Sequence, residues 1–444
     1  MTEEGAEALK RHARHHHSRL RRIVLRVRRA GPACTLTLVL GAVTLFFVGC
    51  LSFSEHGFWK KEEAEKPIEP VAVDRLIRVR LMGRRPRPSE ELSVTAPYAL
   101  TDTQSGAQFG EKQPPVSLAT VRPAGEAGIE IGEKLIPSGD ITLTPSRDAA
   151  IVLGDRTYRG TLRIQREADG LVFTNHLDIE AYLKGVLRGE LPRYFHIESF
   201  KAQCVAARTY ALYSKRNKPA GKTFDVYDDE GSQVYKGVAM EDATAVEAVD
   251  ATHGEVCVYD DGEKEDIFCT YYSSCCGGLS QHVNNVKPND PPAPPLAGRV
   301  ACEDCYVAPR YRWEPVKISK AEVTKKLVAR YPSIRKIGTV TGLRPRKRTE
   351  DGRIISMEIV GSGGQKEVLI GEDFRLSMGG RLVKSTNFAI ETTKDAFIFK
   401  DGKGFGHGMG LCQYGMETKA RRGMDYRRIL ATYYPGSTVK RIYE

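Results

Sequence analysis

The sequence lacks several features that would assign it to a familiar class. No segment repeats along the chain, which argues against a solenoid. No His-Glu-x-x-His motif is present, so the usual signature of a metal-dependent hydrolase is missing. Beyond the first thirty residues there is no stripe of Lys and Arg with interleaved aromatic side chains, so we expect no nucleic-acid partner.

The positive charge of the chain is uneven. The 444 residues carry a formal charge of +11, and the first thirty residues hold nine Lys and Arg against three Glu. The remaining chain is therefore only mildly basic. A chain of this length exceeds what one hydrophobic core supports, so we expect two or three subdomains.

An uncharged apolar run, ACTLTLVLGAVTLFFVGCLSF, follows the basic segment and covers residues 33–53. About twenty such residues span a bilayer, and the positive-inside rule keeps the basic residues 1–32 in the cytoplasm. We therefore predict a single-pass anchor in the cytoplasmic membrane, a charged linker over 54–70 and an extracytoplasmic remainder. Val-Gly-Cys at the end of the run leaves a lipoprotein anchored through Cys50 as the alternative.

The part expected to be exported contains two regions with different residue patterns. Residues 71–170 contain short alternating runs such as LIRVRL and DITLTP between Gly, Pro and Asp, which predicts a β-rich module. Residues 171–444 mix helical and strand patterns, with an inserted subdomain at about 310–400. The expected fold class is α+β: the β-rich module is followed by a mixed α/β catalytic region with a central cleft.

Helical periodicity is clearest after residue 196. Apolar residues recur at helical spacing there and predict a core helix: Ile197, Phe200, Cys204, Ala207 and Ala211. The segment SKAEVTKKLVARY is expected to be helical, whereas IISMEIVG and EVLIG are expected to be strands. Near the end, Asp425 in MDYRRILATYYPG is typical of an N-cap.

A single carboxylate, Glu190, lies in the stretch LRGELPRYF. A partly apolar pocket formed by Leu191, Tyr194 and Phe195 would raise the pKa of Glu190 and let it act as a general acid. The competing interpretation is a solvated carboxylate near the N-terminal end of a helix, where the dipole favours negative charge.

Four ordered motifs resemble one known family. YLKGVLRGELP…FKAQCVAARTYAL, SQVYKG, YYSSCCGG and GFGHGMGLCQYGMETKARRGMDYRRILATYYPG are together similar to the stage II sporulation protein D family, from about Val71 to the C-terminus. The resemblance implies a lytic transglycosylase that acts on peptidoglycan glycan strands already stripped of stem peptides. It also implies that Glu190, in the Gly-Glu-hydrophobic-Pro motif, is the catalytic acid.

One acid suffices for such a reaction. Ordinary glycoside hydrolases need two carboxylates, but in a lytic transglycosylase the C6 hydroxyl of N-acetylmuramic acid attacks C1 and forms a 1,6-anhydro end. Glu190 would protonate the leaving oxygen and then accept the hydroxyl proton. Asp178, Glu180 and Glu198 lie nearby in the sequence, so hydrolysis with a second carboxylate stays open.

The resemblance also suggests substrate contacts. They are Arg208 and Tyr210 in AARTY, Gln233 and Tyr235 in SQVYKG, and His407 and Gln413 in the glycine-rich segment. A structural salt bridge for Arg208, core packing for the SQVYKG residues and a structural hydrogen bond for His407 are the alternatives. The closely spaced glycines before Gln413 would let the backbone approach a ligand or turn tightly. The family usually has Ser-Gln-x-Gly-Ala where this chain has Cys-Gln-Tyr-Gly-Met from Cys412.

The cysteines raise a separate question. Cys302 and Cys305 have C-x-x-C spacing, and with Cys276 they resemble the zinc pattern of some family members. The fourth ligand is open among Cys275, Cys269 and His282, and disulfides are the alternative in an exported chain. Such a zinc would be structural, and no cofactor is required for catalysis.

A second class of function remains. Some proteins of the family are described as enhancers of cell-wall amidases, so this chain could be a glycan-binding partner of an amidase without turnover of its own. A proton donor at Glu190 would be needed only by an enzyme.

Overall fold

The computed structural model describes residues 73–146 and 149–444. The described residues form a mixed α and β structure, as the sequence predicted, and residues 70–444 make one compact unit. Among the described residues, no helix is both long and apolar enough to span a membrane. The predicted anchor at 33–53, the basic segment before it and the linker after it all lie outside the described residues.

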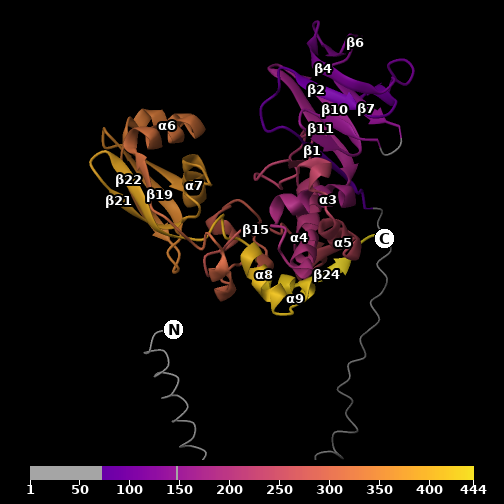
Figure 1. Ribbon diagram of the computed structural model, residues 1–444. Helices are drawn as coiled ribbons and strands as arrows, with labels where there is room; N and C mark the ends of the chain where they lie inside the picture. The colour runs from indigo at the N-terminus through magenta and orange to yellow at the C-terminus, as the bar shows by residue number, and fades with distance from the viewer. Residues whose placement is uncertain (1–72, 147–148) are drawn as a thin grey trace, which may run out of the picture. The chain divides into compact units, whose positions relative to one another are not determined.

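Two six-stranded sheets build the N-terminal part (Figure 1). The first has the order β12 (Val226–Tyr227), β1 (Leu76–Arg80), β11 (Gly170–Asp178), β10 (Thr161–Glu167), β7 (Asp140–Pro145) and β3 (Tyr98–Asp102). The second has the order β6 (Lys134–Ile136), β5 (Gly128–Ile131), β4 (Val116–Ala124), β2 (Glu90–Val94), β8 (Ile151–Leu153) and β9 (Arg156–Tyr158). Alternate residues face the core, as in β1, where Ile77 and Val79 are fully buried.

The first sheet continues past the predicted module boundary at residue 170. Strand β11 runs to Asp178 and pairs antiparallel with β1, and α3 (Ile179–Glu190) follows it directly. Strand β12 comes from the helical region but pairs parallel with β1. The β-rich part and the helices therefore share one hydrophobic core.

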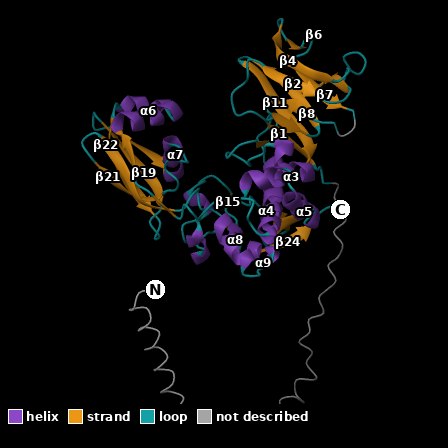
Figure 2. Cartoon of the chain, in the orientation of Figure 1, coloured by secondary structure: helices purple, strands orange, loops and turns teal. Residues whose placement is uncertain are grey.

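Helix α4 (Ile197–Arg216) lies at the centre of the helical region (Figure 2). The predicted apolar stripe is buried, apart from the partly buried Ile197, and several further positions are buried too because α4 packs against several other elements. The surrounding elements are α5 (Ala243–Ala251), α8 (Gln413–Arg421), α9 (Tyr426–Tyr433), β13 (Glu255–Asp260), β14 (Glu265–Ile267) and β24 (Ser437–Arg441). Asp425 caps α9 as predicted, since its side chain accepts a hydrogen bond from the Arg428 N–H.

Two short strands connect distant segments. Strand β15 (Tyr272–Ser273) pairs parallel with β23 (Leu411–Cys412). Short 3-10 helices occupy much of the loop structure: η1 (Gly237–Met240), η2 (Val283–Asn285), η3 (Pro294–Leu296), η4 (Glu303–Val307) and η5 (Pro332–Ile337).

The inserted subdomain has its own hydrophobic cluster, which includes Trp313, Phe374 and Phe399. Its strands are β16 (Arg312–Trp313), β17 (Val316–Ser319), β18 (Val340–Arg348), β19 (Ile354–Gly361), β20 (Lys366–Ile370), β21 (Asn387–Thr392) and β22 (Ala396–Lys403). Figure 1 shows α6 (Lys320–Arg330) and α7 (Gly371–Met378) lying against these strands. The predicted helix and both predicted strands of this region are confirmed.

Candidate functional site

Glu190 is the last residue of α3. The helix ends there because Leu191 precedes Pro192 and adopts an extended conformation, with φ of −118° and ψ of 141°. The interpretation of Glu190 as a carboxylate at a helix N-terminus is therefore wrong. At a C-terminal end the helix dipole disfavours negative charge.

The glycine of the Gly-Glu-hydrophobic-Pro motif has a steric reason. A Cβ at Gly189 would overlap the backbone carbonyl oxygen of Val234. Only glycine allows this close approach, which brings the Val234 N–H to 2.7 Å from Oε1 of Glu190. The glycine of the motif therefore fixes the position of Glu190 relative to the Val234 N–H, which donates to it.

The surroundings of Glu190 favour its neutral form. Burial raises the pKa of the Glu190 carboxyl to about 7, and the negative charge of Glu230 acts in the same direction. Hydrogen bonds from the Val234 N–H and from the side chains of Tyr272 and Gln413 lower the pKa but do not cancel the effect of burial. The residue itself is half-buried, so it keeps access to solvent.

A buried amide orients the Tyr272 hydroxyl. Gln233 is fully buried, and its Nε2 donates to the Tyr272 hydroxyl at 3.1 Å and to the Ala207 carbonyl at 3.2 Å. The Tyr182 hydroxyl donates to Gln233 Oε1 at 3.1 Å. Since the Tyr272 oxygen already accepts from Gln233, its own proton is free to be donated to Glu190. Gln233 therefore orients the Tyr272 hydroxyl toward Glu190. Because Gln233 is fully buried, it does not line a sugar groove.

Gln413 opens α8 and contacts Glu190 from a third segment. Its side chain is buried, hydrogen-bonds Glu190 and lies 3.4 Å from the amide oxygen of Gln203. The Gln203 Nε2 is buried without a hydrogen-bond partner among the described residues. This donor is unpaired but is not exposed at the surface.

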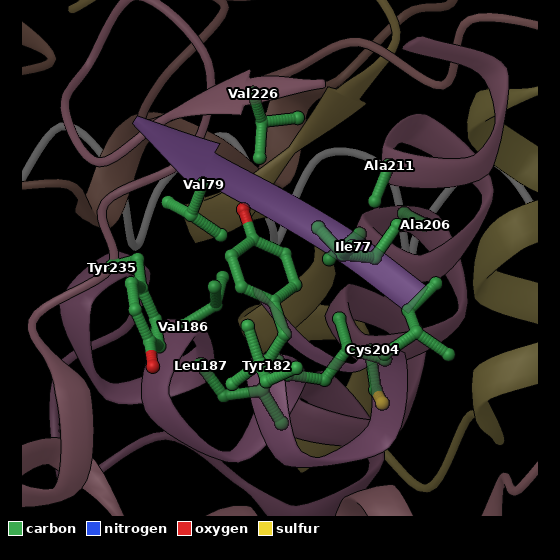
Figure 3. Close-up of a cluster of buried hydrophobic side chains, with 14 of the residues drawn as sticks. Ile77, Val79, Tyr182, Val186, Leu187, Cys204, Ala206, Ala211, Val226 and Tyr235 are labelled. Atoms are coloured by element: carbon green, nitrogen blue, oxygen red, sulfur yellow. The ribbon is translucent and has the colours of Figure 1, made fainter. Parts of the chain in front are cut away.

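Two of the predicted substrate contacts belong to the core instead. Arg208 is fully buried and pairs with both carboxylate oxygens of Glu180, at 2.8 and 2.7 Å. Tyr235 is also buried, and its hydroxyl donates to Asn175 at 3.0 Å. Figure 3 shows Tyr235 beside Tyr182 among aliphatic side chains. For both residues the structure shows the alternative, a salt bridge for Arg208 and core packing for Tyr235, because the face of each element that meets the core cannot be read from sequence spacing.

The nearby carboxylates have structural partners. Glu180 holds Arg208, and its pKa is lowered by that ion pair although burial alone would raise it. Asp178 caps α3. Glu198 pairs with Lys201 at 2.8 Å and accepts a hydrogen bond from the backbone N–H of Tyr426. We find none of them hydrogen-bonded to Glu190.

The glycine-rich loop encloses an arginine. A Cβ at Gly408 would lie 2.8 Å from the guanidinium carbon of Arg353, and one at Gly404 would lie 3.1 Å from its Nη2. Both glycines have positive φ, 78° and 82°. The close approach expected for a ligand is therefore made to Arg353 of the inserted subdomain.

His407 lies in the same loop. Its Nδ1 accepts from the Met409 N–H at 3.0 Å, and its ring packs edge-on against Tyr271 at 5.9 Å. Burial, with Arg375 and Arg353 nearby, lowers the pKa of His407 to about 4, so the ring is neutral. The structural hydrogen bond that was the alternative for His407 is present, and the ring contacts Tyr271.

An aromatic cluster with one exposed member follows Glu190 in the chain. Tyr194 is 59% exposed, and its hydroxyl lies 3.1 Å from that of Tyr414. Phe195 packs edge-on against both rings, at 5.4 and 5.3 Å. Tyr210 is half-buried and its pKa is raised, mainly by burial and in part by the charge of Glu190. The sequence analysis placed Tyr194 beside Glu190, but its partner Tyr414 was missed, since the two residues are 220 positions apart in the chain.

Four thiols lie together. The Sγ atoms of Cys276, Cys302, Cys305 and Cys412 are all within 4.8 Å of one another, and all four residues are buried. A tetrahedral zinc with 2.3 Å bonds places its sulfur ligands about 3.8 Å apart, and Cys276 and Cys305 are separated by 3.7 Å. The donor set therefore fits zinc. The eight cysteines in the described residues are all free thiols.

The structure places Cys412 where the sequence left the fourth position open. Cys275 instead directs its Sγ to the Cys305 carbonyl at 3.7 Å, and His282 Nδ1 caps Asn284. Cys269 is not in the group. The available signal was the cysteine at 412 where the family usually has serine.

The thiols also connect the segments that hold Glu190. Strands β15 and β23 pair Tyr272 with Leu411 and Ser273 with Cys412. Tyr272 lies in β15 and Gln413 directly follows β23, so the pairing of these strands brings both residues to Glu190, with Cys276 and Cys412 close by in the chain. The Cys276 N–H donates to the Cys412 Sγ at 3.3 Å.

The fold and the site define an α+β protein with a half-buried acid at the end of a helix. A cluster of four cysteines lies next to the strands that carry the neighbours of this acid. The chain belongs to the stage II sporulation protein D family, which is associated with the bacterial cell wall. A family model described as stage II sporulation protein matches residues 167–259. Residues 303–410 match a domain of unknown function, DUF8618.

Three relatives are similar to this chain. An uncharacterized protein of Brachyspira hyodysenteriae is 34% identical over 279 residues, which cover 63% of this chain and 71% of that protein. Stage II sporulation protein D of Bacillus subtilis is 26% identical over 280 residues, 60% of this chain and 75% of that protein. The amidase enhancer of Bacillus subtilis is 28% identical over 301 residues, 58% of this chain but only 40% of that protein.

Proposed function

We propose that this protein is a lytic transglycosylase of peptidoglycan glycan strands, with Glu190 as its only acid and base. The observation that carries the proposal is the placement of Glu190: the residue is half-buried at the end of α3 and accepts the Val234 N–H at 2.7 Å, and its burial raises the pKa to about 7. A group with this pKa can give and take a proton near neutral pH. The expected central cleft around it stays a prediction.

In the first step protonated Glu190 donates to the oxygen between N-acetylmuramic acid and N-acetylglucosamine as the C1–O bond breaks. In the second step the C6 hydroxyl oxygen bonds to C1 and its proton passes to Glu190. The sequence of steps needs no second carboxylate and no water. Between the steps Glu190 is ionised, and the donors from Val234, Tyr272 and Gln413 stabilise that charge.

Tyr194, which follows Glu190 by four residues and is 59% exposed, offers an aromatic face to a sugar ring, with the half-buried Tyr414 beside it. The bond between the hydroxyls and the packing of Phe195 hold both rings in place. Gln413 is held by Gln203 and donates to Glu190, and the half-buried Tyr210 lies close enough to Glu190 for its pKa to respond to that charge. The residues that build this surface come from α4, α8 and the loop after α3.

Zinc would be held by Cys276, Cys302, Cys305 and Cys412. It would be structural, since four thiolates leave no open position for a substrate. The residues 33–53 would tether the protein to the cytoplasmic membrane with the described part outside, or Cys50 would do so through a lipid.

The test uses purified, peptide-free glycan strands and mass spectrometry of the products. The parent protein should release fragments with 1,6-anhydro ends. Glu190→Gln keeps size and hydrogen bonding but removes the transferable proton, so it should lower the rate by about 10²–10⁴-fold while strand binding stays within about twofold. Products heavier by one water would instead show hydrolysis.

A second function is favoured by the similarity to the amidase enhancer. On that proposal the chain binds glycan and stimulates a cell-wall amidase without turnover. Stimulation of an amidase that survives Glu190→Gln in full, together with no anhydro product from the parent, would favour the enhancer.

A further inference from the structure

The positive charge of the exported part is concentrated in the inserted subdomain. Residues 310–400 contain 20 Lys and Arg against 10 Asp and Glu. Outside this segment and the first thirty residues, the chain holds 38 Lys and Arg against 43 Asp and Glu. The mildly basic average beyond residue 30 therefore conceals one strongly basic domain, and nothing in the proposed reaction uses that charge.

Within the subdomain, the charge gathers on one edge strand. We call residues 344–348, at the end of β18, the basic ribbon. Arg344, Arg346, Lys347 and Arg348 are all exposed. Strand β18 is at the edge of its sheet, and its register with β19 is irregular at 345–347 and at 347–348. These irregularities break the alternation of faces, so three consecutive cations reach solvent.

Acidic partners do little to neutralise the basic ribbon. Arg344 lies 3.9 Å from Glu358, and Arg348 donates to the backbone carbonyls of Gly352 and Phe388. Arg346 and Lys347 form no salt bridge with any residue that the structure describes. Natural edge strands often carry charge to prevent aggregation, but that role would not require so basic a domain.

The turn after the basic ribbon contacts the region around the candidate site. Glu350 pairs with Arg299 at 3.0 Å, and Arg353 donates to the backbone carbonyl of His407 at 3.4 Å. From the same subdomain Arg381 pairs with Glu230 at 2.7 Å, and the charge of Glu230 acts on Glu190. These contacts join the subdomain to the segments that carry His407 and Glu230.

We propose that the basic ribbon binds the carboxylates of the glycan strand whose glycosidic bond lies at Glu190. The proposal rests on the proposed function and adds a second binding site to it. Peptide-free strands carry a free carboxylate on each muramic acid, and guanidinium groups match carboxylates with two parallel hydrogen bonds. The described β18 exposes no large apolar or aromatic side chain, as insertion into a membrane or stacking on nucleic-acid bases would need.

The test compares two double variants that each lose two positive charges. Arg346→Gln with Lys347→Gln removes the free cations of the basic ribbon. Lys317→Gln with Lys394→Gln removes two exposed lysines elsewhere in the same subdomain. Both are made in full-length Glu190→Gln protein, so that strands are not consumed, and binding to peptide-free strands is measured at low and at high salt.

At low salt the ribbon variant should bind about tenfold more weakly than the Glu190→Gln parent and depend less on salt, whereas the control variant stays within about twofold. Strands whose carboxylates have been converted to neutral amides should bind the parent as weakly as native strands bind the ribbon variant. Equal losses in the two variants, or equal binding of amidated and native strands, would overturn the proposal. So would loss of binding only to vesicles of anionic phospholipid.

The two proposals fail in different ways. If the active protein releases no anhydro product but the ribbon variant still loses strand binding, the transglycosylase function is wrong and the carboxylate site stands. If product forms and strand binding is the same in all the variants, the carboxylate site is wrong.

Discussion

At the scale of single residues, the pH dependence of activity reports on Glu190. Its proton is needed in the first step, so kcat/KM should fall above about pH 7, the pKa of its carboxyl. Tyr272→Phe removes a donor that favours the ionised form, and should move this alkaline limb to higher pH. Glu230→Gln removes a charge that disfavours ionisation, and should move it to lower pH. Each shift should amount to one pH unit or less, roughly.

Profiles of anhydro-product release against pH check this prediction. Glu230→Gln also removes the carboxylate whose charge acts on Glu190. If Glu190 is the only catalytic carboxylate, this variant keeps its activity. Shifts of the two variants in the same direction would mean that another group controls the limb.

The same carboxyl should cost the protein stability above neutral pH. An acid whose pKa is raised in the folded state binds more protons there than in the unfolded chain, so stability falls as pH rises from about 4.5 to about 7. Glu190→Gln removes this cost. We expect the variant to be more stable than the parent by on the order of 1–2 kcal/mol at pH 8, allowing for the exposed part of the residue.

At pH 4 the parent carboxyl is mostly protonated in both states, and the difference should nearly vanish. Urea unfolding at the two pH values measures it. A variant equally stable relative to the parent at both pH values would show that burial does not perturb the acid.

At the scale of elements, the cysteines hold β15 and β23 together just behind Glu190. Cys412→Ser keeps the size of the side chain and restores the residue usual in the family, but it removes one of the four thiols. We expect zinc content to fall well below one ion per chain and the unfolding free energy to fall by several kcal/mol. Activity should fall as well, because Tyr272 and Gln413 lose their support.

Cys275→Ser is the matched control, because Cys275 is adjacent to Cys276 in the chain but outside the group. It should retain zinc. Metal analysis of protein purified without chelators checks both variants. A full zinc ion in Cys412→Ser would contradict this assignment.

Local patterns predicted the elements but not their long-range contacts. Periodicity found α4 and the strands of the inserted subdomain, and the Gly-Glu-hydrophobic-Pro motif found Glu190. Tyr272 and Cys412 were missed as functional residues because β15 and β23 are two residues long and their paired residues are 139 positions apart, so no periodic signal joins them. Arg208 was misplaced for a related reason: its partner Glu180 is on another helix, and only packing decides that both are buried.

At the scale of the whole molecule, the described chain has two separate hydrophobic clusters, and Arg353 connects them. This side chain comes from the inserted subdomain and is fully buried. Its guanidinium donates to the backbone carbonyls of Cys276, Gly406 and His407. The ion pairs Glu350–Arg299 and Arg381–Glu230 also join the two parts, but they are exposed and contribute little, so coupled unfolding should depend mainly on the buried arginine.

In Arg353→Ala, the inserted subdomain and the rest of the described chain should therefore unfold independently. The substitution leaves several backbone carbonyls without a donor and empties the space that the glycine-rich loop encloses, so we expect a loss of about 3 kcal/mol or more in stability. Calorimetry should show one unfolding transition in the parent and two in the variant. Arg330→Ala, at an exposed position in the same subdomain, should keep a single transition. One unshifted transition in Arg353→Ala would mean that the subdomain is joined to the rest by other contacts, and that the loop does not depend on the arginine it surrounds.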